Sequence, residues 1–149
     1  MSQIEFALFL ESAVRLGIPL ALAAMGETIT ERSGVINIGL EGSIIAGALG
    51  GALGAIALEG AGLGLAFGAL AGLLVALVFA VFAIGLGADQ IITGTAVTIG
   101  GLGMTGAVYQ VLFGANGMEL SVPTLAPVTI PWLSEIPVVG SALFAQAPT

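Results

Sequence analysis

Long apolar stretches alternate with short polar gaps along the chain. The apolar stretches cover approximately residues 6–25, 35–58, 61–86 and 91–113. Each is long enough to cross a bilayer as a helix, which takes about 20 apolar residues. The gaps hold charged residues, namely Glu27, Glu31, Arg32, Glu59 and Asp89. Because short connections between long helices favour antiparallel neighbours, the pattern predicts an all-α integral membrane protein with about four transmembrane helices.

Residues 114–149 have a different character. They contain every proline of the chain except Pro19, together with Trp132. Proline removes a backbone donor and disfavours a continuous helix, so we expect a Pro-rich extramembranous loop in which Trp132 lies at the depth of the lipid headgroups. The expected organisation is a single partial transmembrane domain over residues 1–149, made of the four helices and this loop.

Composition excludes several classes of protein. Hydrophobic residues make up 58% of the chain and charged residues 7%, whereas soluble domains carry about 25% charged residues. There is no cysteine and no histidine, which excludes disulfides, thiolate or imidazole metal sites, and nucleophilic catalysis by Cys or His. Two basic residues offer no patch for nucleic acid, and no G-x-x-x-x-G-K-S/T motif is present to bind ATP. We expect no enzyme activity, metal or cofactor.

Small residues recur at helical spacing in two of the apolar stretches. Four glycines stand four residues apart at the start of the third stretch: Gly60, Gly64, Gly68 and Gly72. The second stretch has small residues in the same register: Gly42, Ala46, Gly50 and Gly54. Membrane helices use such residues to approach one another closely. We therefore predict a helix contact on each face, the alternative being chance repetition in a chain with 24 glycines.

The most polar connection is the Gly-rich stretch 26–42, which joins the first two predicted helices. Asn37 and Glu41 are four residues apart, so on a helix they share one face. A carboxylate within hydrocarbon is costly and should face a partner, a cavity or a solute path. We predict that both residues line a translocation pathway. The alternative is that Glu41 lies near the membrane interface and that Asn37 caps the second helix.

The remaining charges of this connection are expected in a solvated turn. Glu27, Glu31 and Arg32 precede the second helix, and an exposed Glu–Arg pair contributes less than about 1 kcal/mol. Since basic residues favour the cytoplasmic side of a membrane, Arg32 predicts a cytoplasmic location for this turn.

A second polar stretch lies at residues 85–95, before the fourth predicted helix. Asp89 is placed to cap the N-terminus of that helix, where a carboxylate also meets the positive end of the helix dipole. Thr93, Thr95 and Thr98 follow in its first turns. They are candidates to contact a polar solute, and Thr93 and Thr95 join Asn37 and Glu41 as predicted pathway residues. The commoner alternative is a hydroxyl bonded back to its own helix.

Three stretches resemble a known family. Residues 12–42 closely resemble the start of permease subunits of ABC importers, in the branch that handles nucleosides and simple sugars and is related to ribose and branched-chain amino acid permeases. Residues 87–96 resemble the second signature of that family, and residues 130–140 also resemble it. Family members are about twice as long, so the chain resembles the N-terminal half of such a permease.

The resemblance implies a multi-pass subunit in the plasma membrane for guanosine-type nucleosides or simple sugars. Its implied partners are a second permease subunit, cytoplasmic ATP-binding subunits that hydrolyse ATP, and an extracytoplasmic substrate-binding lipoprotein. Without the resemblance, two other functions fit the composition. One is a small oligomeric channel or ion-coupled carrier, and the other is a membrane scaffold that transports nothing.

Overall fold

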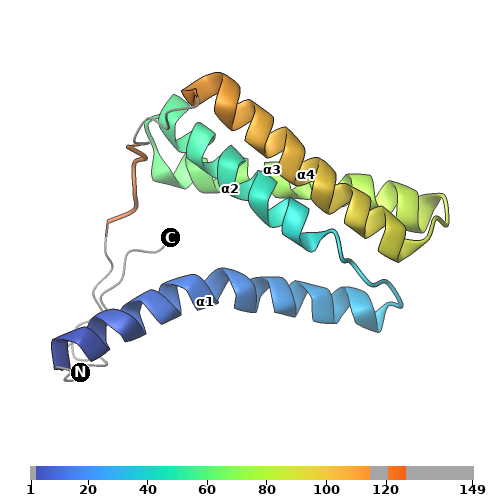
Figure 1. Ribbon diagram of the computed structural model, residues 1–149, viewed down its shortest axis with the longest axis horizontal. Coiled ribbons are helices and arrows are strands. Elements are labelled where there is room, and N and C mark those ends of the chain that lie inside the picture. Colours follow the sequence, from blue (N-terminus) through green and yellow to red (C-terminus); the bar gives the residue numbers. More distant parts are fainter. Residues whose placement is uncertain (1–2, 115–120, 127–149) are drawn as a thin grey trace. The chain divides into compact units, whose positions relative to one another are not determined.

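The computed structural model describes residues 3–114 and 121–126, most of which form helices (Figure 1). The helices are α1 (Gln3–Arg32), α2 (Leu40–Ala57), α3 (Ala61–Ala80), the short π-helix η1 (Val81–Gly85) and α4 (Gln90–Phe113). No strand occurs in this described part, so the predicted all-α class is confirmed. Trp132 and residues 130–140, expected in the extramembranous loop, lie outside the described residues.

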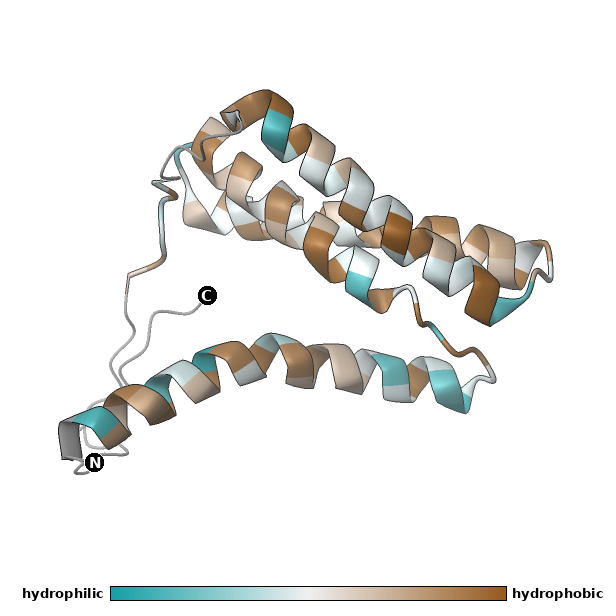
Figure 2. Cartoon of the chain, viewed as in Figure 1, coloured by the Kyte–Doolittle hydropathy of each residue, from teal (hydrophilic) through white to brown (hydrophobic). Residues whose placement is uncertain are grey.

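Within the described residues, four helical segments are long and apolar enough to span a membrane, as the hydrophobic pattern predicts. They are Glu5–Arg32, Leu40–Ala57, Ala61–Gly85 and Gln90–Phe113. Their apolar side chains face outward: Leu16 is 72% exposed, Met104 73% and Val111 83%. In α2 and α4 the most hydrophilic residues lie near the helix ends (Figure 2). A surface this apolar is suited to lipid.

The chain divides into two compact units. One consists of Met1–Gly26 with Thr124–Thr149 and contains most of α1, including Pro19. The other is Glu27–Pro123, which contains the last turns of α1 and the helices α2, α3, η1 and α4. Both polar stretches, from Glu27 onward, belong to this second unit.

The C-terminal end of α1 corrects the expectation of a turn at Glu27, Glu31 and Arg32. The helix continues to Arg32, and the turn that follows contains Gly34, whose φ of +85° is a left-handed conformation that favours glycine. Gly34 N–H donates to Glu31 O at 2.9 Å, and Val35 N–H donates to Thr30 O at 3.1 Å. This pair of bonds is a Schellman motif. Because Gly34 supplies the stop, the charged residues before it remain helical.

Glycines form the contact between α2 and α3. A Cβ added to Gly68 would lie 2.9 Å from Gly47 O and 3.2 Å from Gly51 Cα, and one added to Gly64 would lie 2.8 Å from Gly51 O. No side chain fits at such distances, so the two backbones touch. Gly72, further along α3, lies opposite Gly47, earlier along α2. The two helices are therefore antiparallel.

The predicted register of small residues on α2 is only partly correct. Gly50 and Gly54 flank the α3 contact, against Ala71 and Phe67, whereas Gly42 faces α4 instead. The expectation of a single face was wrong because α2 packs against two helices, and Gly47 and Gly51 form the centre of its contact with α3. Of the four α3 candidates, Gly60 is the N-cap residue, close to Leu58 and Leu63 rather than to the facing helix.

The contact between α2 and α4 is also made of glycines. A Cβ added to Gly42 would lie 2.8 Å from Val97 O, and one added to Gly101 would lie 2.9 Å from Gly42 Cα. Before α2 begins, Gly39 N lies 2.9 Å from a Cβ added to Gly94. The contacts advance along both helices together, so α2 and α4 run parallel (Figure 1). This packing brings the start of α4 beside the connection that precedes α2.

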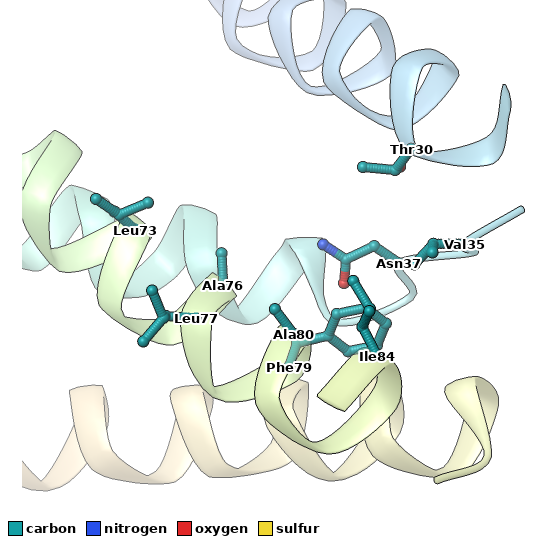
Figure 3. Close-up of a pocket in the computed structure, with 9 residues that line it drawn as sticks. All are labelled: Thr30, Val35, Asn37, Leu73, Ala76, Leu77, Phe79, Ala80 and Ile84. Carbon is teal, nitrogen blue, oxygen red and sulfur yellow. The ribbon is translucent and has the colours of Figure 1, made fainter. Parts of the chain in front are cut away.

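The third predicted helix changes its hydrogen bonding before it ends. After Ala80 the chain continues as η1, where Leu86 N–H donates to Val81 O at 2.9 Å and Ala88 N–H to Phe82 O at 3.0 Å. Wider turns of this kind are rare and are found at functional sites more often than elsewhere. Phe79 and Ala83, on either side of this change, are buried, and Phe79 lies beside Asn37 (Figure 3).

Candidate functional site

The segment from Val35 to Gly39 is not helical, and its backbone groups are paired by side chains from other parts of the chain. α2 begins only at Leu40, with Gly39 as its N-cap residue. Asn37 therefore lies before the helix, and the prediction that Asn37 and Glu41 share a helical face was wrong. Non-helical backbone at membrane depth needs hydrogen-bond partners from within the protein. The side chains that supply these partners therefore show which parts of the chain hold this segment.

Glu27 supplies the first partner from the end of α1. Its Oε1 accepts a hydrogen bond from Asn37 N–H at 2.7 Å, and its Oε2 accepts one from Thr30 Oγ1 at 3.0 Å. Thr30 Oγ1 also lies 2.9 Å from Glu27 O. The half-buried Glu27 carboxylate is thus used within the fold, in contrast to the solvated turn residue expected from the sequence.

Gln90 supplies the second partner from the first residue of α4. Its Oε1 accepts from Ile36 N–H at 2.8 Å, and its Nε2 donates to Gly34 O at 3.4 Å. Gln90 was not predicted from the sequence as a site residue, because Asp89 and the threonines were the more prominent polar candidates in residues 87–96. The only signal was an amide side chain beside a helix N-cap, which also fits an exposed surface position.

Thr98 supplies a third partner. Its Oγ1 donates to Ile38 O at 3.2 Å, so this predicted candidate bonds to another segment rather than back to its own helix. Through Gln90, the stretch 87–96 contacts residues 34–36 of the stretch 12–42, so the two stretches that resemble the family meet in space. Glu27, Gln90 and Thr98 together hold the connection between α1 and α2; we call these three side chains the connection clamp.

Asn37 lies at the edge of a pocket of about 270 Å³. The other lining residues are Thr30, Val35, Leu73, Ala76, Leu77, Phe79, Ala80 and Ile84 (Figure 3). The Asn37 Oδ1 atom is buried and accepts no hydrogen bond from the described residues. An unpaired buried acceptor costs about 1–3 kcal/mol, so this oxygen is an energetically unfavourable feature of the described part of the fold.

The other predicted pathway residues lie elsewhere. Glu41 is exposed in the first turn of α2, where the helix dipole favours a carboxylate. Thr95 Oγ1 donates back to Ile91 O at 2.8 Å on the exposed side of α4. Thr93 is half-buried near the start of α4. The structure thus gathers Asn37 with the clamp residues and leaves Glu41 and Thr95 on the surface.

The remaining candidates have simple local roles. Asp89 Oδ1 accepts from the backbone N–H groups of Ile91 and Ile92, both at 2.9 Å, as the N-cap of α4. Glu31 and Arg32 are exposed in the last turn of α1. A cation at that position complements the negative end of the helix dipole.

These features define a class of protein: a multi-pass membrane protein whose helices pack through glycines around a clamped, non-helical connection. The sequence model of a family described as branched-chain amino acid transport system / permease component matches residues 9–142. The chain therefore belongs to this permease family, and it is a multi-pass protein of the plasma membrane. No solved structure matches the chain at a significant level.

Curated relatives carry the same kind of description. The putative glucose ABC transporter permease protein TsgC13 of Haloferax volcanii is 34% identical over 144 residues, which cover 94% of this chain. The guanosine ABC transporter permease protein NupQ of Bacillus subtilis is 37% identical over 137 residues, and the nucleoside ABC transporter permease protein NupC of Lactococcus lactis is 30% identical over 134 residues. Each of these two matches covers 86% of this chain. The chain spans 42% of the length of each relative.

Proposed function

We propose that the chain is part of a permease subunit of an ATP-driven importer for nucleosides or simple sugars. The observation that carries this proposal is the agreement among relatives from an archaeon and two bacteria. All are described as ABC transporter permeases, for glucose, guanosine or nucleosides, and all align with most of this chain. ATP is hydrolysed by partner subunits, so the role of this chain is to form part of the translocation pathway.

The pocket beside Asn37 is the part of the structure best suited to that pathway. It combines apolar walls with a carboxamide whose oxygen has no donor among residues 3–114 and 121–126. Nucleosides and sugars carry N–H or O–H donors, and a single well-placed acceptor orients such a solute in an apolar site. We propose Asn37 as the solute-contacting residue, and we place Glu41 and Thr95 outside the contact because both are exposed on the described helices.

The partners proposed for the complete importer are a second permease subunit, cytoplasmic ATP-binding subunits and an extracytoplasmic substrate-binding lipoprotein. The exposed apolar surfaces of the four helices offer area for lipid and for further permease helices. The solute is proposed at the level of its class, nucleosides or simple sugars.

A chimeric permease tests the proposal. Residues 1–149 replace the matching part of the Bacillus subtilis guanosine permease, whose own partner subunits remain in the cell. Uptake of labelled guanosine is then measured in a strain that lacks the native permease. We expect uptake above that of the strain without a permease.

A parallel chimera carrying the matching part of the Lactococcus lactis permease is the control for joining two relatives. If that chimera transports and the present one is inserted in the membrane but transports nothing, the proposed function is wrong. The variant Asn37→Ala in the active chimera tests the pathway residue separately.

A further inference from the structure

Gln90 contacts the connection between α1 and α2 through both ends of its carboxamide. The oxygen accepts from Ile36 N–H and the nitrogen donates to Gly34 O, on either side of Val35. In a parallel sheet, one residue of a neighbouring strand would engage the same two backbone groups through its own N–H and C=O. A glutamine carboxamide carries an acceptor and donors, so Gln90 takes the place of that strand.

Asn37 and its two neighbours in sequence are each held by a different side chain. Ile36 N–H is paired with Gln90, Asn37 N–H with Glu27 at 2.7 Å, and Ile38 O with Thr98 at 3.2 Å. Each of these bonds fixes backbone, and none of them uses the Asn37 side chain. The Asn37 oxygen remains buried at the pocket, with no donor from the described part of the chain.

From this geometry we propose that Gln90 is a positioning residue for Asn37. Its carboxamide fixes the backbone at 34–36 and thereby holds the Asn37 carboxamide in the pocket before the solute arrives. A side chain held in advance binds its partner without first losing its conformational freedom. The proposal rests on the proposed function only for the identity of the bound group; the holding of the backbone by Gln90 is tested independently of transport.

The first experiment measures hydrogen exchange of individual backbone amides in the purified full chain in detergent. In Gln90→Ala, the Ile36 amide should exchange about fivefold faster, as expected for the loss of one neutral hydrogen bond. In Gln90→Glu, the carboxylate still accepts from Ile36 N–H, so that amide should stay protected. Gln110→Ala, near the other end of α4, is the matched control and should leave Ile36 unchanged. Protection of the α2–α3 glycine contact in all three variants shows that the fold is retained.

The second experiment measures guanosine uptake by the active chimera and separates KM from the maximal rate. Because Gln90 acts through Asn37, Gln90→Ala should raise KM by about fivefold, and the double variant Asn37→Ala/Gln90→Ala should have the same KM as Asn37→Ala alone. Additive effects of the two substitutions would instead show two independent roles. Gln90→Glu should retain most of the affinity of the parent chimera.

The outcomes decide the two claims separately. Unchanged exchange at Ile36 in Gln90→Ala overturns the positioning role, whatever the uptake. Faster exchange with additive KM effects also overturns it, since Gln90 would then not act through Asn37. If Asn37→Ala leaves KM unchanged, the pathway role in the proposed function is wrong, and the exchange result still decides whether Gln90 holds the connection.

Discussion

The carboxylate of Glu27 accepts a hydrogen bond from the backbone N–H of Asn37 at 2.7 Å, across a separation of ten residues. This bond joins the last turns of α1 to the residue whose side-chain oxygen has no hydrogen-bond donor among the described residues. It pairs Asn37 N–H outside any helix. The bond therefore explains how the backbone of Asn37 is held before α2 begins.

Replacing Glu27 tests that bond. Glu27→Ala removes the acceptor for Asn37 N–H, a charge-assisted bond whose loss costs about 1.5–3 kcal/mol. We expect faster hydrogen exchange of the Asn37 amide and a lower thermal midpoint in detergent. Glu27→Gln keeps a carbonyl oxygen in place, so its thermal midpoint should fall less than that of Glu27→Ala. Equal effects of Ala and Gln would show that the acceptor is not what matters at this position.

The stop of α1 depends on glycine at position 34. Its φ of +85° is costly for a residue with a Cβ, so Gly34→Ala should lower stability by about 1 kcal/mol. Gly26→Ala is the matched control, because a Cβ there meets nothing within 4 Å. In thermal unfolding, Gly34→Ala should therefore have a lower midpoint than Gly26→Ala. A Gly34→Ala protein as stable as the parent would contradict the left-handed conformation.

The glycine contact between α2 and α3 gives a third prediction. In Gly68→Ala the new Cβ would lie 2.9 Å from Gly47 O, which is backbone and cannot move aside without separating the helices. Overpacking of this kind costs about 1–3 kcal/mol. Gly62→Ala, on the same helix with open space around it, should be neutral or slightly stabilising. The comparison is made by thermal unfolding in detergent, and a neutral Gly68→Ala would contradict the close contact.

Asp89, the N-cap residue of α4, gives a fourth prediction. Its Oδ1 accepts two backbone N–H bonds, from Ile91 and Ile92, and loss of such a cap costs about 1 kcal/mol. Asp89→Ala should therefore lower the thermal midpoint, while Asp89→Asn, whose side chain caps nearly as well, should stay close to the parent. A large loss in Asp89→Asn would show that the charge, and not the cap, is required.

The sequence predicts the elements of this fold better than its connections. Apolar length is a local property, so the four spans could be found directly, as could the capping position of Asp89. The start of α2 could not, because it depends on three side chains that lie far from Asn37 in sequence or in another helix. Gln90 and Thr98 are 54 and 60 residues away from the backbone groups that they pair. No periodicity within residues 35–58 records those partners.

The glycines show the same limit. A four-residue repeat in α3 points to one packed face, and Gly64, Gly68 and Gly72 do lie against α2. On α2 the repeat does not define one packed face, because Gly42 contacts α4 whereas Gly47 and Gly51 contact α3. A helix with two neighbours has two overlapping small faces, and spacing alone does not assign them.

The most direct test of the account is solute protection of the pocket with Asn37 left in place. The chain contains no cysteine, so Ala80→Cys introduces a single thiol in the pocket wall, with Ser33→Cys, exposed just after α1, as the control. Both are made in the active chimera, after the cysteines of the fused part have been replaced, and are labelled with a small thiol reagent with and without guanosine. The account predicts that guanosine slows labelling at position 80 and leaves position 33 unchanged. Equal labelling rates at position 80 with and without the solute would contradict it.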